Sequence, residues 1–175
     1  IRGIRISHNG DELSPEVAGD VARMIAPLGW VLQIQDSRKR WIADAAPFLS
    51  NLPVPLIFDH LGRTPAEEGA DGSEFKALRK LLETGRIWVK ISGPNYSSLD
   101  GHPGYADVAE RVRILVDARS DRVLWALNWP HPGLDYDGVV DSADLLDPLL
   151  DWVPDAAVRK MILADNPGRL YGFDA

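Results

Sequence analysis

The chain has 175 residues, 45% of them hydrophobic and 26% charged, which is the composition of a globular domain and not of a disordered or membrane-embedded segment. Asp and Glu number 26 against 19 Lys and Arg, and the net charge of -7 argues against a surface that binds nucleic acid or anionic membranes. The sequence has no cysteine, which excludes disulfides, thiolate metal ligands and a cysteine nucleophile.

The first part of the chain alternates predicted strands with predicted helices. Apolar runs rich in β-branched residues predict strands at 3–7, 30–35 and 55–60. After the first strand, Ser14 and Pro15 form an N-cap and a first-turn proline, so a helix is predicted to begin there. Its periodicity places five apolar side chains on one face, which we expect to be buried: Val17, Val21, Met24, Ile25 and Leu28.

The remaining predicted elements continue this alternation. In chain order they are a helix at 37–50 that Pro47 is expected to kink or shorten, a helix from the Ser73 cap to Gly85, a strand at 87–92, a helix at 105–116, a strand at 123–127, and helices at 142–152 and 155–165. We expect Asn166-Pro167-Gly168 to end the last helix.

Strands that alternate with helices predict βα units on a parallel sheet. Polar side chains follow every apolar run, which favours a (β/α)8 barrel over a doubly wound open sheet, because a barrel gathers all of its strand ends around one mouth. No Gly-rich phosphate motif follows any strand. A whole barrel takes roughly 250 residues, so residues 1–175 are predicted to be a single domain that forms the C-terminal five units of a barrel.

His60 and Arg63 are the first candidates for chemistry. His60 follows a predicted strand directly, and a histidine in that place is as often a structural group as a catalyst. Arg63 favours catalysis, because a guanidinium beside a neutral acid-base group suits a substrate that bears a carboxylate. The alternative for Arg63 is a salt bridge between loop and helix.

Arg5 lies between Ile4 and Ile6, so its side chain points away from both if the segment is extended. It is predicted either to bind a substrate anion or to form a structural ion pair, since a buried arginine is uncommon unless paired. His8, at the end of the same strand, is predicted to be a second polar group at the mouth.

Three further residues follow the last two strands. Tyr96 is predicted to hydrogen-bond a substrate or to cap its own loop, and His131 either lines the site or holds the turn around it. Asn128 interrupts the apolar run at 123–127 where chemistry would be expected, yet an amide has no useful basicity near neutral pH.

The histidine pattern does not predict a metal site. The chain has four His, with neither H-x-H nor H-E-x-x-H spacing, and a metal site needs several convergent ligands. We therefore expect no metal and no cofactor.

Five stretches in chain order, GIRIS, LIFDHLGR, IWVKISG, RVLWALNWPHP and ADNPGRLYGF, resemble the amidohydrolase superfamily. Within it, they are similar to the branch of pyrone dicarboxylate lactonases and related sugar-lactone enzymes. That branch begins with a strand bearing H-x-H, which is absent here, and its members can work without a metal. The resemblance implies that His60 polarises a lactone carbonyl, that Arg63 binds a substrate carboxylate, and that Arg5 is another substrate arginine.

The chain departs from the family pattern at its last strand. The family has G-T-D-W-P-H there, with the aspartate as general base for water, whereas this chain has Ala126, Leu127 and Asn128 before Trp129. The GPNYSS segment also lacks the arginine that the pyrone enzymes place there, which argues against a planar pyrone dicarboxylate as substrate.

A lactone site without this base can still catalyse an internal reaction. A substrate hydroxyl held in the site gains an effective molarity that can reach about 10⁵ M or more, so it can attack the lactone carbonyl in place of water. The resemblance to sugar-lactone enzymes then implies isomerisation of a galactarolactone-like sugar-diacid lactone from a six- to a five-membered ring, with His60 relaying protons and Asn128 hydrogen-bonding a hydroxyl. The alternatives are a sugar-acid or pyrone lactonase with its base elsewhere, such as His8, and a non-catalytic sugar-lactone binding protein.

The expected partner is a small lactone carboxylate, and neither nucleic acid nor a membrane. No segment resembles a signal peptide or a transmembrane helix, so a cytoplasmic protein is expected.

Overall fold

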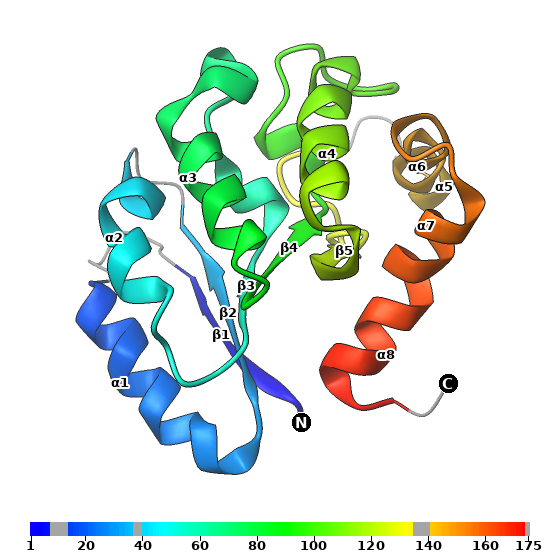
Figure 1. Cartoon of the computed structure of the whole chain (residues 1–175). Helices are drawn as coiled ribbons and strands as arrows, with labels where there is room; N and C mark the ends of the chain where they lie inside the picture. The colour runs from blue at the N-terminus through cyan, green and yellow to red at the C-terminus, as the bar shows by residue number, and fades with distance from the viewer. Residues whose placement is uncertain (8–13, 37–39, 135–140, 174–175) are drawn as a thin grey trace.

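The computed structural model describes residues 1–7, 14–36, 40–134 and 141–173. Five parallel strands form one sheet in the order β1-β2-β3-β4-β5 (Figure 1). The strands are β1 Gly3–Ser7, β2 Val31–Gln35, β3 Leu56–Phe58, β4 Ile87–Ile91 and β5 Val123–Trp125. The helices are α1 Pro15–Ile25, α2 Trp41–Leu49, α3 Ser73–Glu83, α4 Ala106–Arg119, α5 Ser142–Leu146, α6 Pro148–Trp152, α7 Ala156–Lys160 and α8 Asn166–Tyr171. The predicted alternation of strands and helices is confirmed.

Helix α1 begins as predicted but buries a different face. The Ser14 hydroxyl accepts a hydrogen bond from the backbone N–H of Val17 at 3.3 Å, so the predicted N-cap is confirmed. The buried side is formed by Ala18, Gly19, Ala22 and Ile25. The predicted face is wrong for three of its members, because Val17, Met24 and Leu28 are exposed.

Close packing of α1 against α2 explains this result. A Cβ built at Gly19 would lie 2.5 Å from the ring of Phe48, a separation that non-bonded atoms do not reach. Only small residues let the two helices approach so closely, so the side of α1 with the larger side chains faces outward.

The expected end at Asn166-Pro167-Gly168 is wrong. Helix α7 continues through a π-helical turn at Met161–Asp165 into α8, which ends at Gly172 with φ 66°. Asn166 is buried, and its side-chain amide donates to the backbone carbonyls of Ser120 and Val123 at 2.8 and 2.7 Å. Pro167 lies at the start of α8, directly after the π-helical turn.

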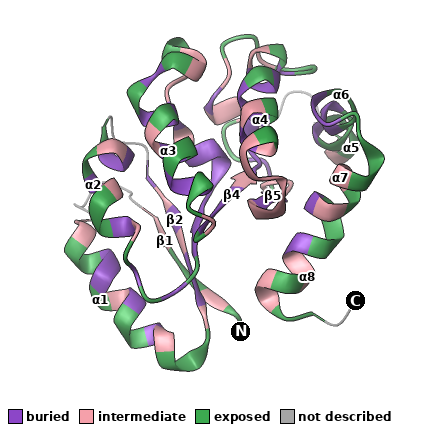
Figure 2. Ribbon diagram, in the orientation of Figure 1, coloured by how far each residue is buried: buried purple, intermediate pink, exposed green. Residues whose placement is uncertain are grey.

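The two faces of the sheet are covered differently. Helices α1 to α4 cover one face, and the main hydrophobic core lies between them and the strands (Figure 2). We call the opposite side the inner face. It carries a smaller apolar cluster against which α8 packs: Val31, Ile57, Trp88 and Leu124, with Leu170 and Tyr171.

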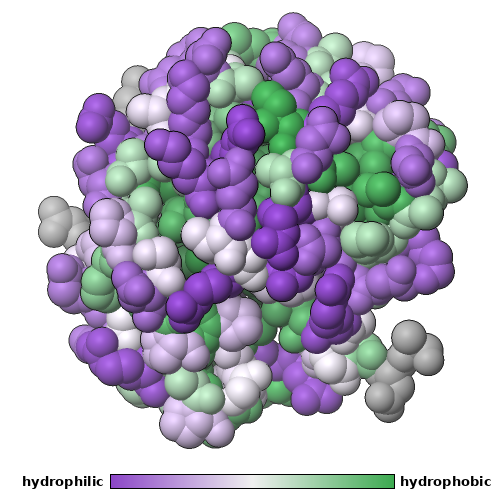
Figure 3. Space-filling view, in the orientation of Figure 1, coloured by the Kyte–Doolittle hydropathy of each residue, from purple (hydrophilic) through white to green (hydrophobic). Residues whose placement is uncertain are grey.

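The outer surface seen in Figure 3 is mostly hydrophilic, with a hydrophobic area in the region of α5 and α6. Leu146 and Leu150 are exposed in these two helices. In the described part of the chain, no helix has the length and apolarity needed to cross a membrane.

Candidate active site

The carboxyl end of β3 leads directly into a tight turn that carries His60. The strand ends at Phe58, two residues before the predicted boundary, because His60 and Arg63 adopt left-handed backbone conformations with φ of 53° and 49°. The ring of His60 is buried, and its Nδ1 lies 2.9 Å from the hydroxyl of Ser92, which directly follows β4. This hydrogen bond holds the ring and leaves Nε2 as the nitrogen available to a substrate.

Burial also controls the protonation of His60. Removal from water lowers the pKa of His60 below its ordinary value of 6.5, although the Asp59 carboxylate and a hydrogen bond to the backbone of Ser92 oppose the shift. The neighbouring cations Arg63 and Lys90 act in the same direction as burial. His60 is therefore neutral near pH 7 and can accept a proton and return it.

Arg63 and His60 both contact the ring of Tyr96. The guanidinium carbon of Arg63 lies 4.3 Å from the ring centroid, and the imidazole centroid of His60 lies 5.1 Å from it. The Tyr96 hydroxyl donates to the carbonyl of Pro132 at 2.9 Å, which ties the loop after β4 to the loop after β5. The Nε of Arg63 is buried with no hydrogen-bond partner among the described residues, so this guanidinium retains capacity to bind a carboxylate.

Gly93 brings Asn128 next to His60. A Cβ at Gly93 would lie 2.8 Å from the Nδ1 of His60 and 3.2 Å from the Nδ2 of Asn128, and Gly93 has φ 51°. Only glycine lets both side chains come so close to this backbone position. Their short distances to it place His60 and Asn128 in one small space. The Nδ2 of Asn128 is buried and, among the described residues, has no hydrogen-bond partner.

His131 is buried in the turn after Asn128. Its backbone N–H donates to the carbonyl of Asn128 at 2.7 Å, and its Nε2 lies 3.2 Å from the hydroxyl of Ser142 at the start of α5. These contacts hold the turn around Asn128. The Nδ1 of His131 has no partner in the parts of the chain that the structure describes.

Arg5 takes part in a charged network on the inner face, beside the His60 turn. It is paired in register with Gln33, and its guanidinium lies 3.7 Å from the buried carboxylate of Asp59. The ammonium of Lys90 lies 3.3 Å from the same carboxylate, and the amide of Gln33 donates to it at 2.6 Å. Both alternatives for Arg5 remain, because its side chain pairs with Asp59 yet is half-exposed.

Sequence reasoning missed Lys90, Gln33 and Ser92. The first two are polar residues inside otherwise apolar strands, at alternate positions that face the inner side, and that pattern was the available signal. Ser92 is a small polar residue immediately after a strand. His8, the remaining predicted site residue, lies outside the described residues.

The site residues that the structure describes do not form a metal-ligand set. In residues 1–7, 14–36, 40–134 and 141–173, no three His, Cys, Asp or Glu side chains gather in a group that could hold a metal ion. The residue beside His60 is an amide, which is a weak ligand compared with a carboxylate.

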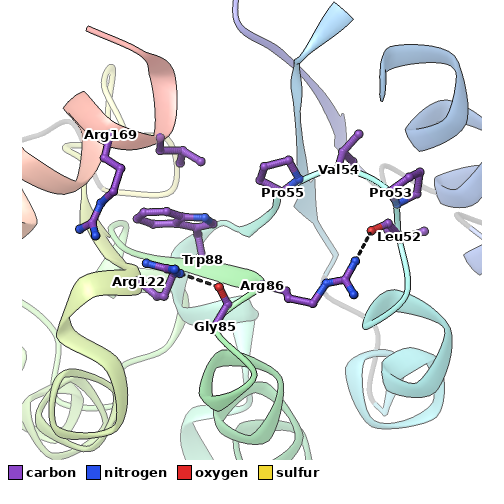
Figure 4. Close-up of a pocket in the computed structure, with 10 residues that line it drawn as sticks. Leu52, Pro53, Val54, Pro55, Gly85, Arg86, Trp88, Arg122 and Arg169 are labelled. Carbon is purple, nitrogen blue, oxygen red and sulfur yellow. Dashed lines mark hydrogen bonds between the residues drawn. The ribbon is translucent and has the colours of Figure 1, made fainter. Parts of the chain in front are cut away.

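A hollow lies at the end of the sheet opposite to His60 (Figure 4). Its volume is about 440 Å³. Its lining residues precede β3, β4 and β5, or lie within β4 or α8: Leu52, Pro53, Val54, Pro55, Gly85, Arg86, Trp88, Arg122, Arg169 and Leu170. The guanidinium carbons of Arg122 and Arg169 lie 4.9 and 6.0 Å from the ring of Trp88. This hollow is remote from His60 and is not part of the candidate site.

Residues 1–173 match the sequence pattern of the family described as Amidohydrolase. The chain belongs to the amidohydrolase family. It is 36% identical over 94% of its length to a 4-sulfomuconolactone hydrolase of Hydrogenophaga intermedia, of which it covers 54%. It is 34% identical over 81% of its length to a D-galactarolactone isomerase of Agrobacterium fabrum, of which it covers 48%. This amidohydrolase chain therefore spans about half the length of the curated relatives that it matches.

A structural comparison shows that this fold occurs in a solved structure. A probable 2-pyrone-4,6-dicarboxylic acid hydrolase of Acinetobacter baumannii, crystallised with citric acid, superposes with a TM-score of 0.84 at 21% identity, over 99% of this chain and 65% of the other. The predicted (β/α)8 fold class and the resemblance to the pyrone lactonase branch of the amidohydrolases are confirmed.

Proposed function

We propose that this amidohydrolase isomerises a sugar-diacid lactone by converting a six-membered aldarolactone ring into a five-membered one. One relative is named a D-galactarolactone isomerase, which supports lactone isomerisation. The observation that carries the proposal is the place of Asn128. Its amide shares one small space with His60, where a hydrolase needs a base for water. An amide can hydrogen-bond a hydroxyl there but cannot deprotonate a water molecule.

In the proposed reaction, His60 moves a proton within the substrate. Its neutral imidazole takes the proton from a hydroxyl of the sugar chain as the oxygen attacks the lactone carbonyl. The new ester C–O bond forms, the old C–O bond breaks, and His60 returns the proton to the departing oxygen. No water is consumed, so the product is an isomer of the substrate.

The other side chains hold the substrate in place. Arg63, packed on Tyr96, binds the free carboxylate, and its Nε is a buried donor that has no partner among the described residues. Asn128 hydrogen-bonds a hydroxyl through its free Nδ2. Arg5, His8, Tyr96 and His131 complete the proposed substrate-binding set.

Hydrolysis of a lactone is the second candidate function. It is favoured by the relative with 36% identity, which is named a hydrolase. In that case a group other than Asn128 activates the water, and His60 is the nearest candidate because it is neutral and buried beside Asn128.

Labelled water separates the two reactions. A six-membered galactarolactone is incubated with the protein in water enriched in oxygen-18, and ring size and ring opening are followed by NMR and mass spectrometry. We expect a five-membered lactone without the label. An open-chain diacid carrying one labelled oxygen, formed faster than in buffer alone, would instead show hydrolysis.

Arg63→Met is expected to weaken substrate binding more than it slows turnover. Truncating one partner of a buried, hydrogen-bonded charge pair costs about 2 to 5 kcal/mol, so KM should rise at least tenfold with a smaller change in kcat. Steady-state kinetics on the lactone measures both values. Arg79→Met, on the outer surface of α3, is the matched control and should leave KM unchanged. An unaltered KM in Arg63→Met would assign Arg63 a structural role.

A further inference from the structure

Arg111 is a fully buried arginine in α4 that belongs to neither the substrate-binding set nor the acid-base chemistry. It lies on the packed side of the helix with Val108, Val112 and Leu115, and its exposed fraction is 1%. A buried guanidinium needs hydrogen-bond acceptors, because its loss of hydration is costly. The positions of its acceptors show which segments Arg111 holds together.

The acceptors of Arg111 lie in the two loops that carry the candidate site. One end of the guanidinium, Nη1, donates to the carbonyl and hydroxyl oxygens of Thr64, both at 3.3 Å. The other end, Nη2, donates to the carbonyl of Ser97. Thr64 directly follows Arg63, and Ser97 directly follows Tyr96, so one side chain joins the residues next to both members of the Arg63–Tyr96 stack.

Asp107, one helical turn earlier, ties the same end of α4 to the loop that contains Tyr96 and Ser97. Its carboxylate accepts hydrogen bonds from the hydroxyl of Ser98 and from the backbone N–H of Leu99, the latter at 2.7 Å. These hydrogen bonds of Asp107 anchor the Tyr96 loop to α4 and involve no residue of the His60–Arg63 turn. Among the bonds described, Arg111 alone connects α4 to both loops.

We propose that Arg111 is a positioning residue that sets the separation of the His60–Arg63 turn and the Tyr96 loop. A planar fork with donors at both ends can bridge two carbonyls at a fixed spacing, whereas a single ammonium is a point donor. Through Thr64 it fixes the backbone that follows Arg63, and through Ser97 it fixes the ring that both His60 and Arg63 contact.

The consequence for chemistry rests on the function proposed above. If Arg63 holds the substrate carboxylate and His60 moves the proton, the distance between them determines whether the hydroxyl meets the carbonyl. A misplacement of about 1 Å can cost roughly 10²-fold in rate. Releasing the bridge should therefore lower kcat more than it raises KM.

The test compares Arg111→Met, which removes every donor, with Arg111→Lys, which keeps the charge but not the fork. Asn166→Ala is the matched control, because Asn166 is also a buried side chain that donates to two backbone carbonyls, at the amino end of β5. The main readout needs no substrate. It is the titration of His60 in protein labelled at histidine, followed by NMR, with urea unfolding measured on each variant.

In Arg111→Met, His60 is expected to titrate closer to 6.5 than in the wild type, because the loosened turn admits water. In Arg111→Lys, the pH at which His60 titrates should lie between those of the wild type and Arg111→Met. In Asn166→Ala, His60 should titrate as in the wild type, even if this variant loses as much stability to urea as Arg111→Met does. If Arg111→Met does not fold, the lysine variant decides. An unchanged His60 titration, or an equal shift in Asn166→Ala, would overturn the proposal.

Turnover of the galactarolactone is measured on the same variants. A fall in kcat of about 10²-fold in Arg111→Met supports the link to catalysis. If the wild type turns over no lactone, the proposed function fails, while the titration of His60 still decides whether Arg111 positions the site.

Discussion

Replacing His60 by asparagine is expected to lower kcat for the lactone by about 10²- to 10⁴-fold, the range that a positioned general acid-base group contributes. KM should change little, because the carboxylate is assigned to Arg63. Asparagine can keep a hydrogen bond to the Ser92 hydroxyl, so the turn should hold its shape. It cannot carry a proton between two oxygens.

His102→Asn is the matched control for this variant. His102 lies in an exposed loop, where its Nε2 is 3.5 Å from a carboxylate oxygen of Asp144, so the same chemical change is made away from the site. Its kcat should equal that of the wild type. Equal rates for His60→Asn and the wild type would remove His60 from the mechanism.

The pH dependence of the wild type should identify the same group. Because burial lowers the pKa of His60 below 6.5, its neutral form persists into mild acid, and activity should fall only when the pH drops through that lowered pKa.

The free energy of unfolding should also decrease as the pH falls through this range. The unfolded chain binds a proton at His60 before the folded one does, so this group's contribution is present above 6.5 and is lost as the pH falls to the folded-state value. His60→Asn should lack this component in pH-dependent urea unfolding.

The fold could be predicted because its signals are local. Each strand is a short β-branched run, each helix has its own apolar spacing, and polar residues follow every strand. The nearness of His60 and Asn128 could also be predicted, since the carboxyl ends of parallel strands meet at one edge. The buried face of α1 could not, because it depends on how closely Gly19 lets α2 approach.

The fine geometry of the site depends on contacts between elements distant in sequence. The left-handed conformations of His60 and Arg63 have no marker in residues of these types, and Gly93 is marked only by being a glycine after a strand. Arg111 could have been found, because it lies three residues after Val108 and four before Leu115, within the buried stripe of its helix. Charged residues in such a stripe are candidates for buried bridges.

Asn128→Asp is expected to give the protein a hydrolase activity. Asn128 has φ 59°, a left-handed conformation that asparagine and aspartate tolerate better than other residues with side chains, so the exchange should preserve the backbone. The carboxylate would stand beside the Nδ1 side of His60, where the amide now stands. A general base there can activate water, and this contributes about 10²-fold or more to hydrolysis.

The assay gives both proteins a six-membered aldarolactone and compares the open-chain diacid fraction by NMR, corrected for spontaneous ring opening. Hydrolysis in the variant should increase as the pH rises through the pKa of the new carboxyl group, because only the ionised form accepts a proton. Asn51→Asp, an exposed position between α2 and β3, adds the same charge away from the site and should produce no diacid.

Two outcomes contradict the proposed role of Asn128. Efficient hydrolysis by the wild type would mean that the amide never prevented water activation, and an Asn128→Asp variant that isomerises but does not hydrolyse at any pH would mean that no attacking water reaches this position.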